Sequence, residues 1–468
     1  MMLLPELSIL CFSIIFLFIS LGEKKTNPIN AAKSLSILVF ALTLLAFFKQ
    51  GTLFAGAYKI DTFSQLFKVV LACGLCLVLF MLDKKDEIEE KYLSEFIMFL
   101  GFSTLGLMML TSANELISIV IALEISSYSL YVIVPLRKNP VKIQLEASMK
   151  YLFFGAISTG VMLYGMSYIY GMTQSTFLSE ILYTFPRFLN QPIGVFALVL
   201  TLTGFFFKLS LFPMHFWSPD IYEGASNTTT TFIATIPKIA ATAIIIRIVS
   251  LASTMDVQFV NILMVLAAIS MTFGNLVGLV QKDVKRLLAY SGIAHAGYLL
   301  LGILALSRDG YSAAMFYITV YLFMNLAAFY VIILLSKKGE NIVLDDLAGL
   351  SKRAPLLAVT LGIAAFSLAG IPPTGGFTGK LFLFTSAYKE GHLAIVIIGA
   401  VNTAISIFYY LNLVRMSFSK EAVSTETEPI SLTINEKIIC YLLIFLILYF
   451  GIYPYGLLGI LKLAVLNI

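Results

Sequence analysis

Charged residues are few in this sequence, and their scarcity limits the possible folds. Asp, Glu, Lys and Arg together make up 12% of the 468 residues, about half of the share found in ordinary globular domains. Hydrophobic residues make up 59%, and the mean hydropathy is +0.94. A water-soluble protein of this length could not bury so much apolar surface. We therefore expect a membrane protein that carries no soluble domain.

Cysteine is also rare. The four cysteines are Cys11, Cys73, Cys76 and Cys440, and all lie within apolar stretches. Cys73 and Cys76 have CxxC spacing, but neither a second pair nor a nearby histidine accompanies them, so we expect them to pack rather than to bind metal or react. This pattern excludes a cysteine-ligated iron–sulfur cluster in the chain.

Nucleotide-binding motifs are missing as well. The stretch 375–380 faintly resembles a phosphate-binding loop, but Thr374 stands where the earlier glycine is required and Leu381 replaces the Ser or Thr. The net charge of +5 does not indicate nucleic-acid binding, because the positive charge lies in connectors between apolar runs. We expect no cofactor or metal in this chain, so any redox chemistry must occur elsewhere.

Long apolar runs dominate the rest of the sequence. A spanning helix needs about 20 mostly apolar residues, and the runs predict an all-α, polytopic fold with about 14 transmembrane helices. The first run lacks a basic leader and a small-residue cleavage site, so we interpret it as a helix rather than a signal peptide. The expected spans are 4–21, 35–50, 64–82, 92–110, 113–135, 144–170, 192–213, 226–251, 258–280, 286–306, 311–336, 355–388, 393–416 and 437–460.

The distribution of Lys and Arg over the connectors predicts the orientation, because these residues concentrate on the cytoplasmic side. With the N-terminus outside, the inside connectors carry 19 of them and the outside connectors carry five. The inside set is Lys24, Lys25, Lys33, Lys84, Lys85, Lys91, Arg137, Lys138, Lys142, Lys282, Lys285, Arg286, Lys337, Lys338, Lys352, Arg353, Arg415, Lys420 and Lys437. The outside set is Lys49, Lys59, Arg187, Arg308 and Lys389. This bias predicts that both termini lie outside.

An internal symmetry suggests four regions. Residues 1–91 would form three scaffold helices, 92–251 and 258–417 two inverted five-helix repeats, and 418–468 a C-terminal helix. Each repeat is expected to contain a proline-interrupted helix that bears a lysine: the seventh, with Lys208 before Pro213, and the twelfth, with Pro372 and Pro373 before Lys380. Broken helices of this kind line ion sites in transporters, because freed backbone groups face a polar cavity.

A few titratable residues lie within the predicted spans. They are Glu124, Lys208, Lys238 and Lys380, with His295 beside them. A charge at mid-bilayer costs roughly 2.5–3.5 kcal/mol on insertion scales, so such residues usually have a function. Burial disfavours the charged form of lysine and glutamate alike, which prepares both for proton exchange. Histidine titrates near neutral pH and suits a relay step.

Each of these residues also has a structural alternative. Lys208 and Lys380 could extend to the membrane surface, Lys238 could lie less deeply than its sequence suggests, Glu124 could pair with a lysine, and His295 could serve helix packing. Lys150 and Arg247 lie nearer to helix ends and are expected to be interfacial or structural. The first three helices and the fourteenth carry few such charges, and we interpret them as scaffold.

Several motifs resemble those of the antiporter-like membrane subunits of respiratory complex I, and the N type among them in particular. The resemblance extends over nearly the whole chain. The matching stretches are 4–7, 146–151, 207–224, 285–298 and 370–380. Ser226–Thr228 departs from the more proline-rich turn of the family, and Gly292 stands where serine is usual.

The resemblance implies a proton half-channel in each repeat, joined by a polar axis. Glu124 then matches the glutamate of the fifth helix and Lys208 the lysine of the seventh. Lys238 matches the connecting lysine of the eighth helix, and His295 lies on the tenth, between the halves. Lys380 matches the lysine of the twelfth helix near the exit. The M type has glutamate at that position, and the L type carries an additional lateral helix.

The resemblance also implies partners and a location. Membrane-arm subunits of the K and M types are the expected neighbours, in a bacterial cytoplasmic membrane, and NAD, FMN, iron–sulfur clusters and quinone are expected in partner subunits. Two other functions remain open. A subunit of a Na⁺/H⁺ antiporter or membrane-bound hydrogenase would share the fold and the lysines. A non-pumping docking subunit would tolerate replacement of Lys208 or Lys380 by alanine.

Overall fold

The computed structural model describes residues 1–22, 28–82, 87–138, 142–250, 257–336, 339–419 and 429–466, and most of them are helical. Some basic connector residues that carry the orientation argument lie outside these ranges. They are Lys24, Lys25, Lys84, Lys85, Lys337, Lys338 and Lys420.

The described residues up to Ser250 form ten α-helices. They are α1 (Leu4–Leu21), α2 (Ile29–Ala46), α3 (Thr62–Met81), α4 (Leu93–Ser112), α5 (Leu116–Ile133), α6 (Lys142–Thr173), α7 (Leu178–Thr184), α8 (Pro192–Leu209), α9 (Trp217–Gly224) and α10 (Asn227–Val249). Short 3₁₀ turns are η1 (Phe54–Gly56), η2 (Glu90–Tyr92), η3 (Val134–Leu136) and η4 (Phe185–Phe188). Strands β1 (Gly51–Leu53) and β2 (Tyr58–Ile60) form an antiparallel hairpin between α2 and α3.

Nine more α-helices lie in the described part of the chain from Val257 onward. They are α11 (Val257–Gly278), α12 (Val284–Leu304), α13 (Arg308–Leu335), α14 (Leu350–Arg353), α15 (Pro355–Ala369), α16 (Gly375–Lys389), α17 (Leu393–Phe418), α18 (Ile434–Ile452) and α19 (Tyr455–Val465). One 3₁₀ turn, η6 (Leu344–Leu347), precedes α14.

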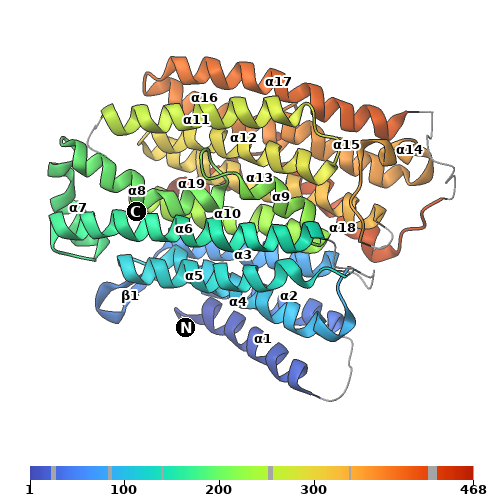
Figure 1. Ribbon diagram of the computed structural model, residues 1–468, viewed down its shortest axis with the longest axis horizontal. Coiled ribbons are helices and arrows are strands. Elements are labelled where there is room, and N and C mark those ends of the chain that lie inside the picture. The colour runs from blue at the N-terminus through green and yellow to red at the C-terminus, as the bar shows by residue number, and fades with distance from the viewer. Residues whose placement is uncertain are drawn as a thin grey trace.

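The long helices run side by side along the longest axis of the molecule (Figure 1). The β-hairpin, α7 and both chain termini lie at one end, which we call the hairpin end. The other end, which we call the basic end, carries Arg137, Lys285 and Arg286. There Arg137 donates hydrogen bonds to the Gly224 and Gly339 carbonyls. Both termini therefore lie on the same side of a bundle with an even number of crossings.

The predicted all-α membrane fold is confirmed. Thirteen helices of the described chain are long and apolar enough to cross a membrane. The shorter helices α15 and α16 together make the fourteenth crossing. Helix α15 starts beside the basic end, and α16 ends at Lys389. The Nζ of Lys389 lies 3.4 Å from Asp309, which is at the start of α13 at the hairpin end. The bundle thus has the predicted number of crossings.

Some boundaries differ from the predicted ones. Helix α2 starts at Ile29 rather than 35, and the last predicted helix divides into α18 and α19 at Pro454. The backbone at the end of α18 leaves the helical conformation at Tyr453, since a residue before proline is disfavoured in the α region. The hairpin and α7 lie between the predicted spans. Hydropathy did not predict them, because it does not distinguish a short surface element from a loop.

Both predicted helix breaks are present. Helix α8 ends at a left-handed Ser210 (φ 62°), and α15 ends at a left-handed Gly370 (φ 84°). In each case the next amide bonds back to the carbonyl five residues earlier, namely Leu211 to Phe206 and Ile371 to Phe366. This closure turns the C-terminal carbonyls of α8 and α15 inward, in the middle of the bundle.

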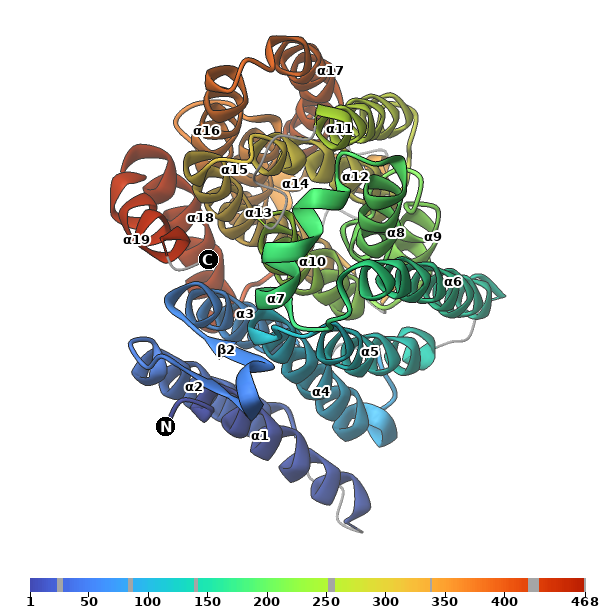
Figure 2. The same ribbon diagram turned by 90° about the vertical axis from the view of Figure 1, so that its left-hand side faces the viewer.

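The centre of the bundle is shielded from lipid. The most apolar window of α10 is fully buried and those of α12 and α13 are 94% buried, whereas those of α1, α2, α6 and α17 are 33% buried. Viewed end-on, α10 and α13 lie at the centre, with α1 and α2 below and α17 above (Figure 2). Polar groups on α10, α12 and α13 are therefore held inside protein.

Candidate functional site

Lys208 lies in the last turn of α8, immediately before the first helix break. Its side chain is buried, and its Nζ has no hydrogen-bond partner within the described part of the chain. The ammonium lies 5.6 Å from the centre of the Tyr151 ring, which stacks on Trp217. A cation gains stability from an aromatic face and from the negative end of a helix dipole. Lys208 therefore has an aromatic face and a helix C-terminus, but no ion-pair partner in contact, to stabilise its charge.

Glu124 lies on α5, at the edge of this region, and is partly exposed. Its carboxylate accepts a 2.6 Å hydrogen bond from the Thr159 hydroxyl on α6. It forms no ion pair with Lys208, whose Nζ is unpartnered among the described residues. The structure thus places Glu124 near the lysine's helix but does not bring the two charges into contact.

Lys238 lies in the middle of α10, directly after Pro237. Its Nζ donates a 3.3 Å hydrogen bond to the Tyr321 hydroxyl on α13. Gly292 on α12 leaves room for this ammonium, since a Cβ there would come within 2.8 Å of Nζ. The family departure at Gly292 therefore has a local consequence, which is space beside Lys238. Pro237 also frees one backbone carbonyl of α10.

His295 lies between the two halves of the site, on α12. Its Nδ1 is 2.5 Å from the Tyr317 hydroxyl, and its Nε2 is 3.0 Å from the Tyr410 hydroxyl. Tyr410 bonds in turn to the Ser291 hydroxyl. The Tyr321 ring, which holds Lys238, lies 5.4 Å from the imidazole, centroid to centroid. His295 is thus part of a hydrogen-bonded network of hydroxyls.

Lys380 lies on α16, beyond the second break, and its side chain turns back toward α15. Its Nζ donates 3.0 Å hydrogen bonds to the carbonyls of Leu368 and Ala369, and it lies 4.5 Å from the centre of the Tyr298 ring. The two lysines start from different halves of their broken helices. Both ammonium groups nevertheless lie where the first half-helix ends, at the negative pole of its dipole.

The tyrosines that contact these residues were not predicted from the sequence. They are Tyr298, Tyr317, Tyr321 and Tyr410, all buried. A signal was present, because Tyr317 and Tyr321 are four residues apart and so share one face of α13. Buried hydroxyls are costly unless they are bonded, so aligned tyrosines in an apolar helix indicate a polar interior.

A buried ion pair between α1 and α3 was also not predicted from the sequence. Lys68 on α3 is fully buried, and its Nζ lies 2.6 Å from a carboxylate oxygen of Glu6 on α1. The Tyr58 hydroxyl donates to the same oxygen. The interpretation of the first three helices as plain scaffold was therefore incomplete, because Lys68 lies well inside the span from 64 to 82.

Replacing Lys68 by methionine is expected to destabilise the assembled protein by about 3 kcal/mol, since removing one partner of a buried pair leaves the other charge uncompensated. The measurement is the melting temperature and yield of the membrane complex. The double variant Glu6→Gln, Lys68→Met should recover most of the loss. A single variant as stable as the parent protein would contradict a structural role for this pair.

The two charges that were placed nearer to helix ends are both paired. Lys150 is partly exposed, and its Nζ lies 2.6 Å from carboxylate oxygens of both Glu146 and Asp220. Arg247 is buried, 3.1 Å from Asp61. Burial alone would raise the pKa of Asp61, but the Arg247 guanidinium and the Ser64 amide outweigh this effect and hold the pKa below its ordinary value.

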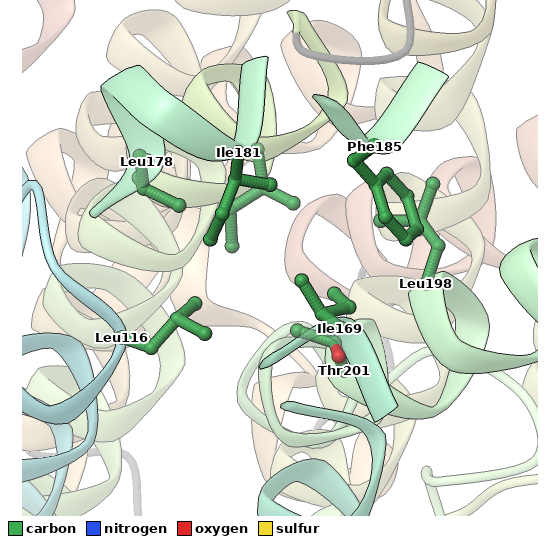
Figure 3. Close-up of a pocket in the computed structure, with 8 residues that line it drawn as sticks. Leu116, Ile169, Leu178, Ile181, Phe185, Leu198 and Thr201 are labelled. Atoms are coloured by element: carbon green, nitrogen blue, oxygen red, sulfur yellow. The ribbon is translucent and has the colours of Figure 1, made fainter. Parts of the chain in front are cut away.

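The hairpin end is closed above α8 by apolar side chains. A cavity of about 10 Å³ lies there under α7, lined by Leu116, Ile169, Leu178, Ile181, Phe185, Leu198, Thr201 and Ile248. Figure 3 shows these side chains pointing toward one another, with Thr201 contributing the only polar atom among those drawn. A space of this size and lining does not hold a chain of water molecules. We call this apolar closure under α7 the dry seal, and it is unsuited to carry water between α8 and the hairpin end.

Comparisons with known proteins agree with this geometry. Residues 113–406 match the family model for the transmembrane region of NADH:quinone oxidoreductase and Mrp antiporters. The chain is 42% identical to NADH-quinone oxidoreductase subunit N 2 of Opitutus terrae, over 96% of this chain and 95% of that protein. It is similar to a chain of respiratory complex I from Thermus thermophilus, with a TM-score of 0.84, 29% identity, and 97% and 98% of the two chains covered.

A chain of the Mrp complex from Dietzia sp. shares the fold, with a TM-score of 0.86, 19% identity, and 100% and 96% of the two chains covered. The fold alone therefore does not separate the two branches, whereas the sequence identity to N subunits does. This chain belongs to the NADH:quinone oxidoreductase/Mrp antiporter membrane family and, within it, to the N subunits of NADH-quinone oxidoreductase.

Proposed function

We propose that this chain is a proton-translocating membrane-arm subunit of NADH-quinone oxidoreductase. The observation that carries the proposal is the array of three buried lysines, Lys208, Lys238 and Lys380, in which a histidine and tyrosine hydroxyls lie between the last two. Lysine can exchange its proton when buried, whereas arginine cannot. An array of this kind can hold, pass and release protons without any redox centre.

Each residue has a distinct role in this proposal. A change elsewhere in the complex, driven by quinone reduction, alters the separation between Glu124 and Lys208. When the Glu124 carboxylate is close, it favours the protonated form of Lys208. When the carboxylate moves away, this stabilisation is lost, and Lys208 passes its proton toward Lys238. The network around His295 carries the proton on to Lys380, which releases it. The contacts of Tyr321 with Lys238 and of Tyr298 with Lys380 support this order.

The dry seal at the hairpin end supports one direction of access. If Lys208 cannot reach the hairpin end, its half of the bundle exchanges protons with the basic end. The excess of Lys and Arg in the connectors supports the proposal that this end lies inside and both termini lie outside a bacterial cytoplasmic membrane. The two broken helices, α8–α9 and α15–α16, cross in opposite directions, in keeping with inverted repeats over 92–251 and 258–417.

The proposal places the redox chemistry and the neighbours elsewhere in a complex. NAD, FMN, the iron–sulfur clusters and quinone belong to other subunits, and this chain acts as a module of a translocase. K-type and M-type membrane subunits are the proposed neighbours. The large apolar side chains exposed on α5 and α6, such as Ile121, Tyr128 and Phe153, suit lipid or such partners.

Deleting the gene for this chain is expected to abolish quinone-coupled proton pumping in membranes of the source bacterium. Oxidation of NADH with a soluble electron acceptor should persist, because that reaction takes place in other subunits. The measurement is proton uptake by inverted membrane vesicles on addition of NADH. If the deletion instead abolished only Na⁺/H⁺ exchange and left NADH-driven pumping intact, the chain would be an antiporter subunit.

A further inference from the structure

The basic end contains a buried carboxylate that none of the proposed steps uses. Glu87 is 5% exposed. One of its oxygens accepts hydrogen bonds of 3.1 Å from both the backbone amide and the hydroxyl of Thr228, in the first turn of α10. The other oxygen is buried without a partner among the described residues. Buried polar atoms in native proteins are usually bonded to protein or to water, so this oxygen marks a hydrated point.

The first turn of α10 is arranged around this carboxylate. The Ser226 hydroxyl caps the helix by accepting from the Thr229 amide, so the turn that departs from the family pattern is a well-formed helix start. Asn227 lies beside Glu87, and both of its amide atoms are buried without a well-formed hydrogen bond. Glu87 and Asn227 therefore interact with each other but leave polar atoms without a well-formed hydrogen bond at this end of α10.

A polar stripe leads from this point to Lys238. Asn227, Thr231 and Thr235 follow one another at intervals of four residues, and Lys238 comes three residues later. Residues at such spacing lie on one face of a helix, and the helix rises about 16 Å between Asn227 and Lys238. Every residue of α10 is buried. The Tyr222 hydroxyl, which also has no partner among the described residues, lies near the far end of the stripe, 4.0 Å from the Cβ position of Gly292.

Other charged groups set the environment of Glu87. The charges of Lys285 on α12 and Arg137 after η3 interact with Glu87, and Asp283 and Glu223 act in turn on these two cations. Lys285 donates to the Ala225 carbonyl rather than to Glu87. Burial raises the pKa of the Glu87 carboxyl, although the hydrogen bonds from Thr228 and the Lys285 charge oppose this effect. Protonation of Glu87 therefore occurs closer to neutral pH than for an exposed glutamate.

We propose that Glu87 and the polar face of α10 form a second route by which Lys238 takes up protons from the basic end, in addition to its supply from Lys208. The inference rests on the proposed function and adds the point of entry. Water at the basic end gives a proton to the Glu87 carboxylate. The resulting carboxylic acid passes it to the neutral Lys238 amine through water that donates to the Thr231 and Thr235 oxygens, since both hydroxyls donate their own protons to backbone carbonyls of α10. Lys238 becomes an ammonium, and Glu87 returns to the carboxylate.

The test is Glu87→Gln in the assembled complex, with Glu89→Gln as the matched control, since Glu89 is two residues away and solvent-exposed. Lys238→Met defines the part of proton pumping that depends on Lys238. Glu87→Gln should reduce that part by roughly tenfold when the solution at the basic end is alkaline. A positioned proton-transfer group contributes at least about 100-fold, and water provides a partial bypass. The deficit should shrink at acidic pH, and Glu89→Gln should pump normally.

The outcomes separate the two proposals. Normal pumping by Glu87→Gln at alkaline pH, with loss in Lys238→Met, would overturn the entry route and leave the proposed function intact. Normal pumping by Lys238→Met would overturn the proposed function itself. If Glu87→Gln does not assemble, the isosteric double variant Thr231→Val, Thr235→Val replaces it. That variant must show the same alkaline deficit, and normal pumping would overturn the route.

Discussion

Replacing Lys208 by methionine is expected to stop proton transfer through Lys208 and to lower strongly the proton pumping that depends on this chain, while the complex still assembles. Methionine keeps the length and the apolar stem of lysine but removes the charge. Because a buried membrane charge costs roughly 2.5–3.5 kcal/mol on insertion scales, the variant should be at least as stable as the parent. The Nζ of Lys208 has no hydrogen-bond partner among the described residues, so its removal leaves no broken bond behind.

The measurement is the number of protons taken up per NADH oxidised, in vesicles that contain equal amounts of assembled complex. Lys389→Met is the control, because Lys389 is exposed and its ion pair with Asp309 lies at the hairpin end. The control should pump normally. Unchanged proton uptake in Lys208→Met would refute a role of Lys208 in translocation and would favour a docking function for the chain.

Much of the fold follows from the sequence, because the bilayer restricts it so strongly. Every apolar run long enough to span is forced into a helix, since backbone groups cannot stay unbonded in lipid. The breaks after Lys208 and before Lys380 were also predictable, since each contains proline. The precise ends of α2 and α18 were not, because they depend on capping and on a single Pro454 rather than on hydropathy.

The site residues were identifiable one by one, but not their geometry. A lysine side chain is long and flexible, so its position in a helix does not say where its ammonium lies. Lys380 shows this clearly, since its Nζ reaches back to Leu368 and Ala369 on the preceding helix. The separation of Glu124 from Lys208, and the Tyr317 hydroxyl on His295, depend equally on tertiary packing between distant segments.

Residues outside the expected repeats were the hardest to find. Glu87 is an ordinary connector residue in the sequence, and only the packing of α10 against it shows that it is buried. The pairing of Glu6 with Lys68 joins residues 62 positions apart, which no local pattern indicates. These cases share one cause, because the depth of a charge near a helix end is set by neighbouring helices.

Replacing Lys380 by arginine is expected to preserve assembly but to stop proton release. Arginine keeps a positive charge near the carbonyl groups of Leu368 and Ala369, where the end of α15 favours a cation. It does not lose its proton in proteins. A role that requires only charge would survive this change, and a role that requires deprotonation would not. The same vesicle measurement of protons per NADH distinguishes the two.

Lys389→Arg, at the end of the same helix, is the matched control and should leave pumping unchanged. Lys380→Met provides the second comparison, because it removes both the charge and the exchangeable proton. If Lys380 exchanges protons, arginine and methionine should be equally inactive, although only arginine keeps the cation. If arginine retains full pumping while methionine loses it, Lys380 acts as a fixed charge that holds the second break, and the proton leaves through another group.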